Sequence, residues 1–461
     1  MFRTLASTVF LLAAICGPFS SATQTLSVDY ISFDSAKPVL QGFANNLPPD
    51  LKAAGAQLDA QKWSAWVKAS DAKIRQRLIS GEADTLTNLL RFGVTFTKEY
   101  RIEDEYLLKY GQSSLVDSFA NTRANDLIRA FAAPHPAPGI AEMRDFVVSQ
   151  GYSFKTPADR AKVKKYLLDN LARERDEFAK YRAQKKDESR FQLFQERGIS
   201  LDSNLWPDYA LDLAFRKLAE KGLLKPGSVR RVAIVGPGLD FVNKEAGVDY
   251  YPPQTVQPFA VLDSLLRLGM ADSSSTALFT FDISPSVNSH VARIRQSAQQ
   301  GTAYVVQLPW NTQRPMSTDY RAAFVAYWQK LGSQIGENVT AIPVPASVQG
   351  TDTRAVKIKP QFAARITPVD TNIVYQRPLL APDQKFDLVI GTNIFLYYGA
   401  FEQSLARANI AAMLKPGGLL LSNDKLSATV SSQLQDVLDV NVVSSQNPLV
   451  SDTIFCYQRE K

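Results

Sequence analysis

The sequence predicts an α/β fold in which a mostly parallel sheet follows an α-helical N-terminal part. Before residue 198, apolar residues such as Leu51, Ala54 and Leu58 recur at three- and four-residue spacing, which indicates helices with one buried face. After residue 198, short β-branched stretches alternate with helical ones, which is typical of parallel sheets covered on both faces. The expected strands are Arg231–Val235, Ala277–Asp282, Ala303–Leu308, Arg365–Val369, Phe386–Ile390 and Gly418–Ser422.

These patterns divide the 461 residues into three parts. We expect a signal peptide over 1–22, an α-helical domain over 23–200 and the α/β domain over 201–461, with an insertion at about 303–360. Within the helical part, the stretch from Pro157 to Arg197 predicts a long helix with a solvated face of mixed charge. Two late strands, around Val440–Val443 and Thr453–Tyr457, suit an antiparallel hairpin at the sheet edge.

The N-terminus has the features of a secretory signal. One basic residue, Arg3, precedes an apolar run from Leu5 to Phe19, and small residues lead up to Ala22. The run is too short for a membrane-spanning helix, and no other stretch approaches that length. We therefore expect a bacterial-type exported protein, periplasmic or extracellular, with no integral membrane segment after cleavage. A cytoplasmic protein with a buried N-terminal helix is the alternative.

Charge and side-chain counts exclude several classes of site. The net charge of +7 is spread thinly over both halves of the chain, so we expect no basic stripe and no nucleic-acid partner. His135, expected in an exposed loop, and His290, expected to be solvated on a surface helix, are the only histidines, which excludes a histidine-rich metal site. Cys16 and Cys456 are too few for a four-thiolate zinc site, so no metal is expected.

A glycine turn follows directly on the strand Arg231–Val235. Gly236-Pro237-Gly238 allows a sharp turn and lets a ligand approach the backbone without a side chain in the way. A polar and aromatic segment, in which Tyr250 and Tyr251 either close over the site or anchor the loop, separates this turn from the next expected helix. A phosphate-binding helix N-terminus is therefore not predicted, which argues against a nicotinamide-dependent oxidoreductase.

Asp282 stands at the carboxyl end of the second strand of the α/β part. An acidic residue at this place can accept hydrogen bonds from two ribose hydroxyls. The alternative is that Asp282 only caps the helix expected from Pro285. Because the glycine turn lies upstream, we favour the ligand-binding interpretation.

Two further motifs follow in order. The strand Phe386–Ile390 leads into Gly391-Thr392-Asn393, and a helix expected from about Glu402 to Met413 precedes Leu414–Leu421. Together with the glycine turn and Asp282, this order resembles the class I S-adenosylmethionine-dependent methyltransferases, whose sheet is Rossmann-like. The resemblance implies S-adenosylmethionine as the cofactor, bound by Gly236, Gly238 and Asp282.

Within that superfamily, residues 228–461 look most like the chemotaxis-receptor (CheR-type) glutamate methyltransferases. Asp282-Ile283-Ser284 is similar to their second-strand ending, and Asn393–Tyr398 is similar to their Asn-Val-Leu-Ile-Tyr-Phe stretch. Thr392 stands where those enzymes carry an Arg, and region 23–200 does not match their short basic N-terminal domain. The roles that the resemblance implies are cofactor contact for Ile283 and Asn393, a place near the adenine for Asp370 and Thr371, and a catalytic, substrate-side role for Tyr397.

The expected function is methyl transfer from S-adenosylmethionine to an acceptor that the sequence does not identify, either a protein carboxylate or a small molecule. The alternative is an exported, non-catalytic binding protein built on a methyltransferase-like domain. This alternative arises because the cofactor is made in the cytoplasm, whereas the leader predicts export. For Tyr397, packing against the sheet edge is an equally good interpretation. The sequence does not predict the oligomeric state.

Overall fold

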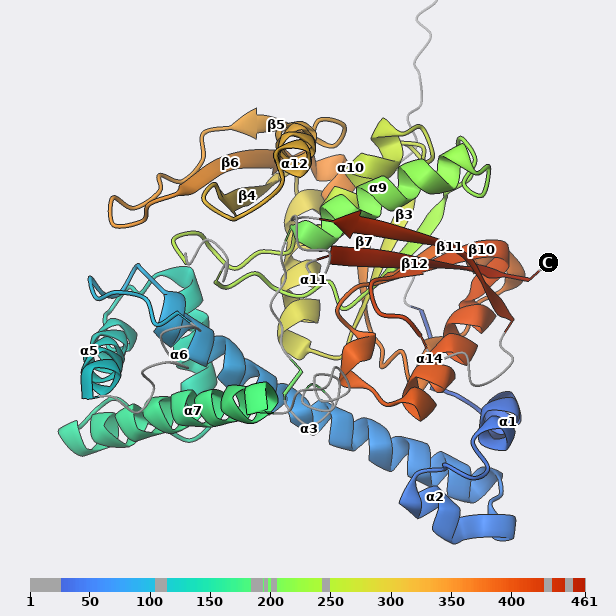
Figure 1. Ribbon diagram of the computed structural model, residues 1–461, viewed down its shortest axis with the longest axis horizontal. Coiled ribbons are helices and arrows are strands. Elements are labelled where there is room, and N and C mark those ends of the chain that lie inside the picture. Colours follow the sequence, from blue (N-terminus) through green and yellow to red (C-terminus); the bar gives the residue numbers. More distant parts are fainter. Residues whose placement is uncertain are drawn as a thin grey trace, which may run out of the picture.

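The central feature of the computed structural model is a seven-stranded sheet with the order β11-β12-β10-β9-β2-β3-β7 (Figure 1). The structure describes residues 26–103, 114–183, 194, 198–199, 205–242, 249–426, 433–443 and 451–460. The strands are β2 (Arg231–Val235), β3 (Ala277–Asp282), β7 (Ile366–Asp370), β9 (Phe386–Gly391), β10 (Leu414–Ser422), β11 (Leu434–Val443) and β12 (Ser451–Arg459). Strand β12 runs antiparallel to β10 and β11, whereas β10, β9, β2, β3 and β7 are parallel, so the predicted mostly parallel sheet is confirmed.

Helices cover both faces of this sheet because its strands alternate apolar side chains between two cores. Val232 and Ile234 pack in one core with helices α9 (Trp206–Glu220) and α10 (Gln257–Arg267). Ala233 and Val235 pack in the other core, with helix α14 (Ala400–Met413) and part of the N-terminal helices. Helix α11 (Pro285–Gln299) follows β3 and contacts both cores.

A second, smaller sheet lies beside the main one. It has the order β4-β6-β5 and is antiparallel, with strands β4 (Tyr304–Asn311), β5 (Gly336–Val339) and β6 (Thr351–Ile358), and it carries helices α12 (Thr318–Lys330) and α13 (Pro360–Ala363). The stretch Ala303–Leu308 was expected among the parallel strands, and this expectation is wrong because it forms β4 of the small sheet. A short apolar run has the same pattern in either kind of sheet, so its partner strand alone decides the matter.

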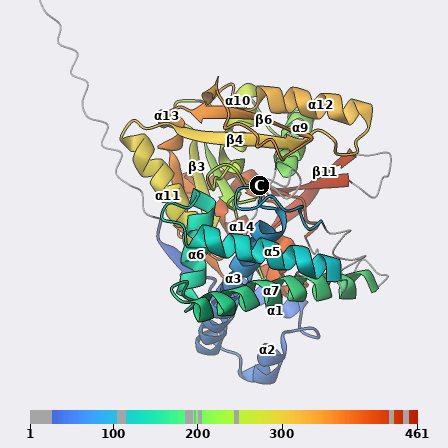
Figure 2. The ribbon, with the colours of Figure 1, turned by 90° about the vertical axis from the view of Figure 1, so that its left-hand side faces the viewer.

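The N-terminal part is built around one long helix, α3 (Ala60–Phe92). Figures 1 and 2 show α5 (Ser114–Phe131), α6 (Pro138–Ser149) and α7 (Pro157–Ala183) around one end of α3, and α1 (Phe33–Gly42) and α2 (Pro49–Ala54) near the other. Short 3-10 helices span Gly55–Gln57, Pro382–Gln384 and Phe395–Tyr397. The part predicted as an α-helical domain also contains a strand, β1 (Val28–Tyr30), which pairs antiparallel with β8 (Gln376–Pro378).

Several predictions fall outside the described residues. The proposed leader over 1–22, with Cys16, is one of them, as is most of the predicted helix beyond residue 183. Within the part of the chain that the structure describes, no helix has the length and apolar character needed to cross a membrane.

Candidate functional site

The strand register brings the predicted site residues to one edge of the main sheet. Asp282 pairs with Asp370, and Val235 pairs with both Phe281 and Gly391, so the loops after β2, β3, β7 and β9 leave the same edge. Strands β3 and β7 lie on one side of β2, and β9 and β10 lie on the other. In open parallel sheets, such a reversal of strand order leaves a crevice at the carboxyl ends, where ligands bind. The predicted residues at this edge are Gly236, Gly238, Asp282, Ile283, Asp370, Thr371 and Asn393.

The glycine turn after β2 requires its glycines. Gly236 and Gly238 have φ values of 63° and 67°, a region that side chains disfavour. The backbone N–H of Gly236 donates to the carbonyl of Phe281 at 2.8 Å. A Cβ on Gly236 would lie 2.1 Å from Cδ1 of Ile394, so the loop after β9 packs closely on this turn.

The loop that follows the turn is held by its two tyrosines. Tyr251 is 2% exposed and donates its hydroxyl to Oδ2 of Asp240 at 2.8 Å. The hydroxyl of Tyr250 is bonded to that of Thr353 in β6. Of the two interpretations of these tyrosines, the structure therefore shows anchoring of the loop.

Asp282 is buried at the end of β3 with its carboxyl group held by backbone amides. Its Oδ1 accepts a hydrogen bond from the N–H of Ser284 at 2.8 Å. Burial raises the pKa of Asp282 to about 7, the charge of Asp370 adds to this, and hydrogen bonds from the amides of Ser284, Ile283 and Gly238 oppose it. The capping alternative is wrong, because Ser284 is the N-cap of α11 and accepts from the N–H of Val287 at 3.3 Å.

The end of β7 offers one exposed and one buried polar side chain. The Asp370 side chain is 59% exposed and its Oδ1 lies 2.7 Å from Nη2 of Arg75. Thr371 donates its backbone N–H to the carbonyl of Asp282 at 3.1 Å, and its side chain is buried. The Thr371 hydroxyl has no hydrogen-bond partner within the described residues, so a polar group of a ligand could satisfy it.

Asn393 is exposed at the end of β9 and has φ 58°, the one positive value among the described non-glycine residues. Its backbone N–H donates to Oδ1 of Asn423 at 2.7 Å, and Nδ2 of Asn423 donates to Oδ1 of Asn393 at 2.8 Å. Oδ2 of Asp424 accepts from the N–H groups of Phe395 and Leu396 at 3.0 and 3.2 Å. Asn423 and Asp424 were not predicted from the sequence, although both follow directly on an expected strand.

Tyr397 lies in the 3-10 turn after Asn393 and is 8% exposed. Its ring stands edge-on to that of Phe194 with centroids 6.0 Å apart, and its carbonyl accepts from Nη1 of Arg77 at 3.0 Å. Burial raises the pKa of the neighbouring Tyr398 far above neutrality, so its phenol stays protonated. These contacts give Tyr397 a packing role at this edge, and its catalytic role stays a prediction.

One face of helix α3 supplies polar groups to the same edge. These groups were not predicted from the sequence. Arg75 donates from Nη1 to the carbonyl of Ile283 at 3.3 Å, from Nη2 to Oε1 of Gln376 at 3.2 Å, and from Nε to Asp71 at 3.2 Å. Oδ1 of Asp71 in turn accepts from Nδ2 of Asn372 at 2.7 Å. Burial alone would lower the pKa of Arg75, but the hydrogen bond and charge of Asp370 and of Asp71 outweigh it and raise the pKa.

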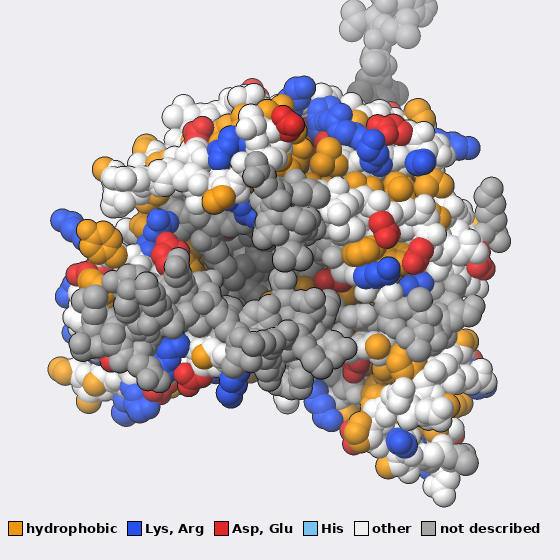
Figure 3. Space-filling view, in the orientation of Figure 1, with side chains coloured by type: hydrophobic (Ala, Val, Ile, Leu, Met, Phe, Trp, Pro, Cys, Tyr) orange, Lys and Arg blue, Asp and Glu red, His pale blue; other side chains and the backbone are white. Residues whose placement is uncertain are grey.

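Glu82 lies on the same face of α3, since residues seven apart are two turns apart on a helix. Its Oε1 accepts from the hydroxyl of Ser286, in the first turn of α11, at 3.2 Å. Burial raises the pKa of Glu82. Figure 1 draws α11 above α3, and Figure 3, in the same orientation, shows basic and acidic side chains interspersed over the described surface. The only sign of this face in the sequence is that Asp71, Arg75 and Glu82 recur at four- and seven-residue spacing along one helix.

We expect Arg75→Met to destabilise the protein by roughly 1–3 kcal/mol, because it leaves the buried Asp71 carboxylate without its cation. The measurement is urea unfolding at neutral pH. Lys37→Met is the matched control, because it removes an exposed cation paired with an exposed Asp34 and is expected to change stability by less than about 0.5 kcal/mol. Equal effects of both substitutions would contradict the role given to Arg75.

The two histidines differ from each other in burial. His135 is exposed in a loop, as predicted. His290 was expected to be solvated, and this is wrong: it is 9% exposed, and its Nε2 lies 3.2 Å from the hydroxyl of Tyr304 in β4. Burial lowers the pKa of His290 to about 4, so it is neutral at pH 7. The described residues contain no cluster of His, Cys, Asp or Glu suited to a metal ion.

Comparisons with known proteins give distant structural likenesses. No protein-family model and no curated protein matches the chain. Among solved structures, the N-methyltransferase NodS of Bradyrhizobium japonicum WM9 is 11% identical, with a TM-score of 0.26, over 56% of this chain and 98% of NodS. The magnesium protoporphyrin IX methyltransferase of Synechocystis PCC 6803, with bound SAM, is 12% identical, with a TM-score of 0.25, over 60% of this chain and 92% of that one. At these TM-scores neither likeness supports a functional conclusion for this chain.

Proposed function

We propose that this chain is an S-adenosylmethionine-dependent methyltransferase whose cofactor binds at the carboxyl edge of the main sheet around β2. The observation that carries the proposal is the meeting of the buried Asp282 carboxyl group with the glycine turn at the point where strand order reverses. An acidic side chain at this position can bind the two hydroxyls of a ribose, and the turn keeps side chains away from the ligand.

Other groups at this edge fit the same ligand. The unsatisfied hydroxyl of Thr371 lies next to Asp370 at the end of β7, where the resemblance places the adenine. Asn393, in the loop after β9, has a positive φ, is hydrogen-bonded to Asn423 and is exposed. A buried polar atom without a partner and an ordered, exposed amide are what a bound nucleoside would use.

Such a cofactor would supply a methyl group carried on a positively charged sulfur. The transfer disperses that charge, so the residues of this chain act by orienting the reactants and excluding water. A carboxylate or thiolate acceptor needs no base, whereas an amine or hydroxyl needs a proton acceptor. The likeness of the Asn393–Tyr398 stretch to the chemotaxis-receptor enzymes supports a carboxylate acceptor, with Tyr397 on the substrate side.

Calorimetric titration of the full chain with S-adenosylhomocysteine tests this proposal. We expect binding with a dissociation constant in the micromolar range, because the ribose alone gains two hydrogen bonds to a charged group. NAD⁺ is the control and is expected not to bind, since the next described helix after Gly238 begins only at Gln257. Failure of S-adenosylhomocysteine to bind a folded sample would contradict the proposal and favour the non-catalytic, exported binding protein.

A further inference from the structure

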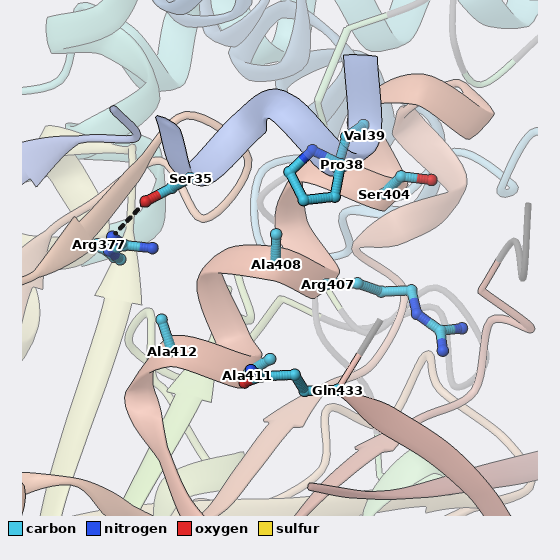
Figure 4. Close-up of a pocket in the computed structure, with 10 residues that line it drawn as sticks. All are labelled: Ser35, Pro38, Val39, Arg377, Ser404, Arg407, Ala408, Ala411, Ala412 and Gln433. Carbon is cyan, nitrogen blue, oxygen red and sulfur yellow. Dashed lines mark hydrogen bonds between the residues drawn. The ribbon is translucent and has the colours of Figure 1, made fainter. Parts of the chain in front are cut away.

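A pocket lies between helices α1 and α14, and none of its lining residues is among those assigned to the carboxyl edge of the sheet. It has a volume of about 280 Å³. Figure 4 shows one wall formed by α1 and the other by α14, with Arg377 of β8 at one end and Arg407 at the other. Its lining residues are Ser35, Pro38, Val39, Arg377, Ser404, Arg407, Ala408, Ala411, Ala412 and Gln433.

The long walls of this pocket are apolar, and small side chains leave the space open. Ala408, Ala411 and Ala412 face it from α14, and Pro38 and Val39 face it from α1 (Figure 4). Alanine side chains are too short to fill the gap between the two helices. A volume of this size is near the lower end for small-molecule sites, so it suits a small ligand with an apolar body.

The charged residues that line the pocket are both basic. Two guanidinium groups line it, and no Asp or Glu is among the lining residues. Arg407 is committed to the protein, since it donates to the carbonyls of Leu426 and Leu434 at 3.4 and 2.9 Å and lies over the ring of Tyr457. An anion in the pocket would therefore bind the guanidinium at the other end.

Arg377 is that group. It is half-buried, and Nη2 donates to the hydroxyl of Ser35 at 3.1 Å (Figure 4). Burial lowers the pKa of Arg377, and the charge of Asp29, its cross-strand neighbour in β1, opposes this. Within the described residues Arg377 forms no ion pair, so a guanidinium that has lost part of its hydration keeps hydrogen-bond donors to spare. Carboxylates match such a group best, because they accept two parallel N–H bonds.

We propose that this pocket binds a small carboxylate with a short alkyl chain, its head group on Arg377 and Ser35 and its chain along the alanine wall. The site is tied to the candidate cofactor edge through α14. Asn409 of this helix donates to the carbonyls of Ile373 and Val374, just after Thr371, at 3.1 and 2.9 Å. Binding at the pocket nevertheless uses none of the residues assigned to the cofactor.

Titration of the full chain with octanoate tests the proposal by calorimetry or ligand-observed NMR. We expect saturable binding to the native chain, at least tenfold weaker binding to Arg377→Met, and loss of binding to Ala408→Leu, which fills the pocket without removing charge. Lys37→Met on α1 is the matched control, because it removes a positive charge that does not line the pocket, and it is expected to bind octanoate as the native chain does. Octan-1-ol is expected to bind at least tenfold more weakly than octanoate.

Thermal melting separates a binding defect from a folding defect in each variant. If Arg377→Met melts well below the native chain, octanoate binding to Ala408→Leu still tests the place of the ligand. The comparison of octanoate with octan-1-ol still tests the need for a carboxylate. No saturable binding of octanoate to the native chain, or equal binding to the native chain and Ala408→Leu, would overturn the proposal. Neither result depends on whether S-adenosylhomocysteine binds, so this site and the proposed methyltransferase function fail or stand separately.

Discussion

Replacing Asp282 by Asn is expected to weaken the binding of S-adenosylhomocysteine by roughly 10- to 100-fold. The carboxylate can accept from both ribose hydroxyls, whereas the amide offers a single acceptor oxygen, and a hydrogen bond to a charged group contributes about 1.5–3 kcal/mol. Calorimetry at pH 8 measures this loss. Asp50→Asn in α2 is the matched control, because it changes an exposed carboxylate, paired with the exposed Lys73, that is not among the residues assigned to the cofactor, and it is expected to leave affinity unchanged.

The same substitution is expected to stabilise the unliganded protein at pH 8. Burial raises the pKa of Asp282 from 3.8 to about 7, so between these values the folded chain binds a proton that the unfolded chain has released. Stability therefore falls as pH rises from about 4 to 7, and the cost is complete above pH 7, on the order of a few kcal/mol. Asp282→Asn removes this cost, so its gain in urea unfolding should be present at pH 8 and shrink towards pH 4.

Ligand affinity should show the opposite dependence on pH. A protonated Asp282 loses half of its acceptor capacity, so S-adenosylhomocysteine should bind the native chain more weakly as pH falls below 7. The Asn variant should lack this part of the pH dependence. A variant that binds as tightly as the native chain and shows the same pH profile would contradict the ribose role of Asp282.

Gly81→Ala is expected to destabilise the protein by roughly 1–3 kcal/mol, although alanine is the better helix former. Gly81 lies within α3, where a Cβ would stand 1.8 Å from the backbone oxygen of Ile199. Gly198 makes the reciprocal approach, since its Cβ would lie 2.3 Å from the backbone nitrogen of Gly81. Neither backbone can yield as a side chain would, so the substitution forces the two segments apart. Urea unfolding measures the change.

Gly139→Ala is the matched control for this prediction. Gly139 is in the first turn of α6, and an added Cβ would meet only side-chain atoms of Pro253, at 3.8 Å and beyond. This substitution should be neutral or stabilise by up to about 1 kcal/mol through helix propensity. If Gly81→Ala stabilised the protein by a similar amount, the close crossing of α3 with Gly198 and Ile199 would be disproved.

Much of the candidate site follows from strand ends in the sequence. The glycine turn after β2 and Asp282 at the end of β3 could be placed because the carboxyl ends of parallel strands lie at one edge of the sheet. The same rule also predicts that Asn423 and Asp424, after β10, lie at this edge. Arg75 and Glu82 could not be predicted in this way, because the sequence of a helix does not show which loop its polar side chains contact.

The sequence by itself determined the mostly parallel sheet of the α/β part, the glycine turn and the acidic end of β3, since these depend on local periodicity and on residues within one strand and its loop. Only the tertiary structure decided that Ala303–Leu308 belongs to a second sheet, that His290 is buried against Tyr304, and that one face of α3 meets the ends of β3 and β7. Each of these depends on a partner far away in the chain. Burial and pairing are properties of two surfaces that meet, and a local pattern describes one of them.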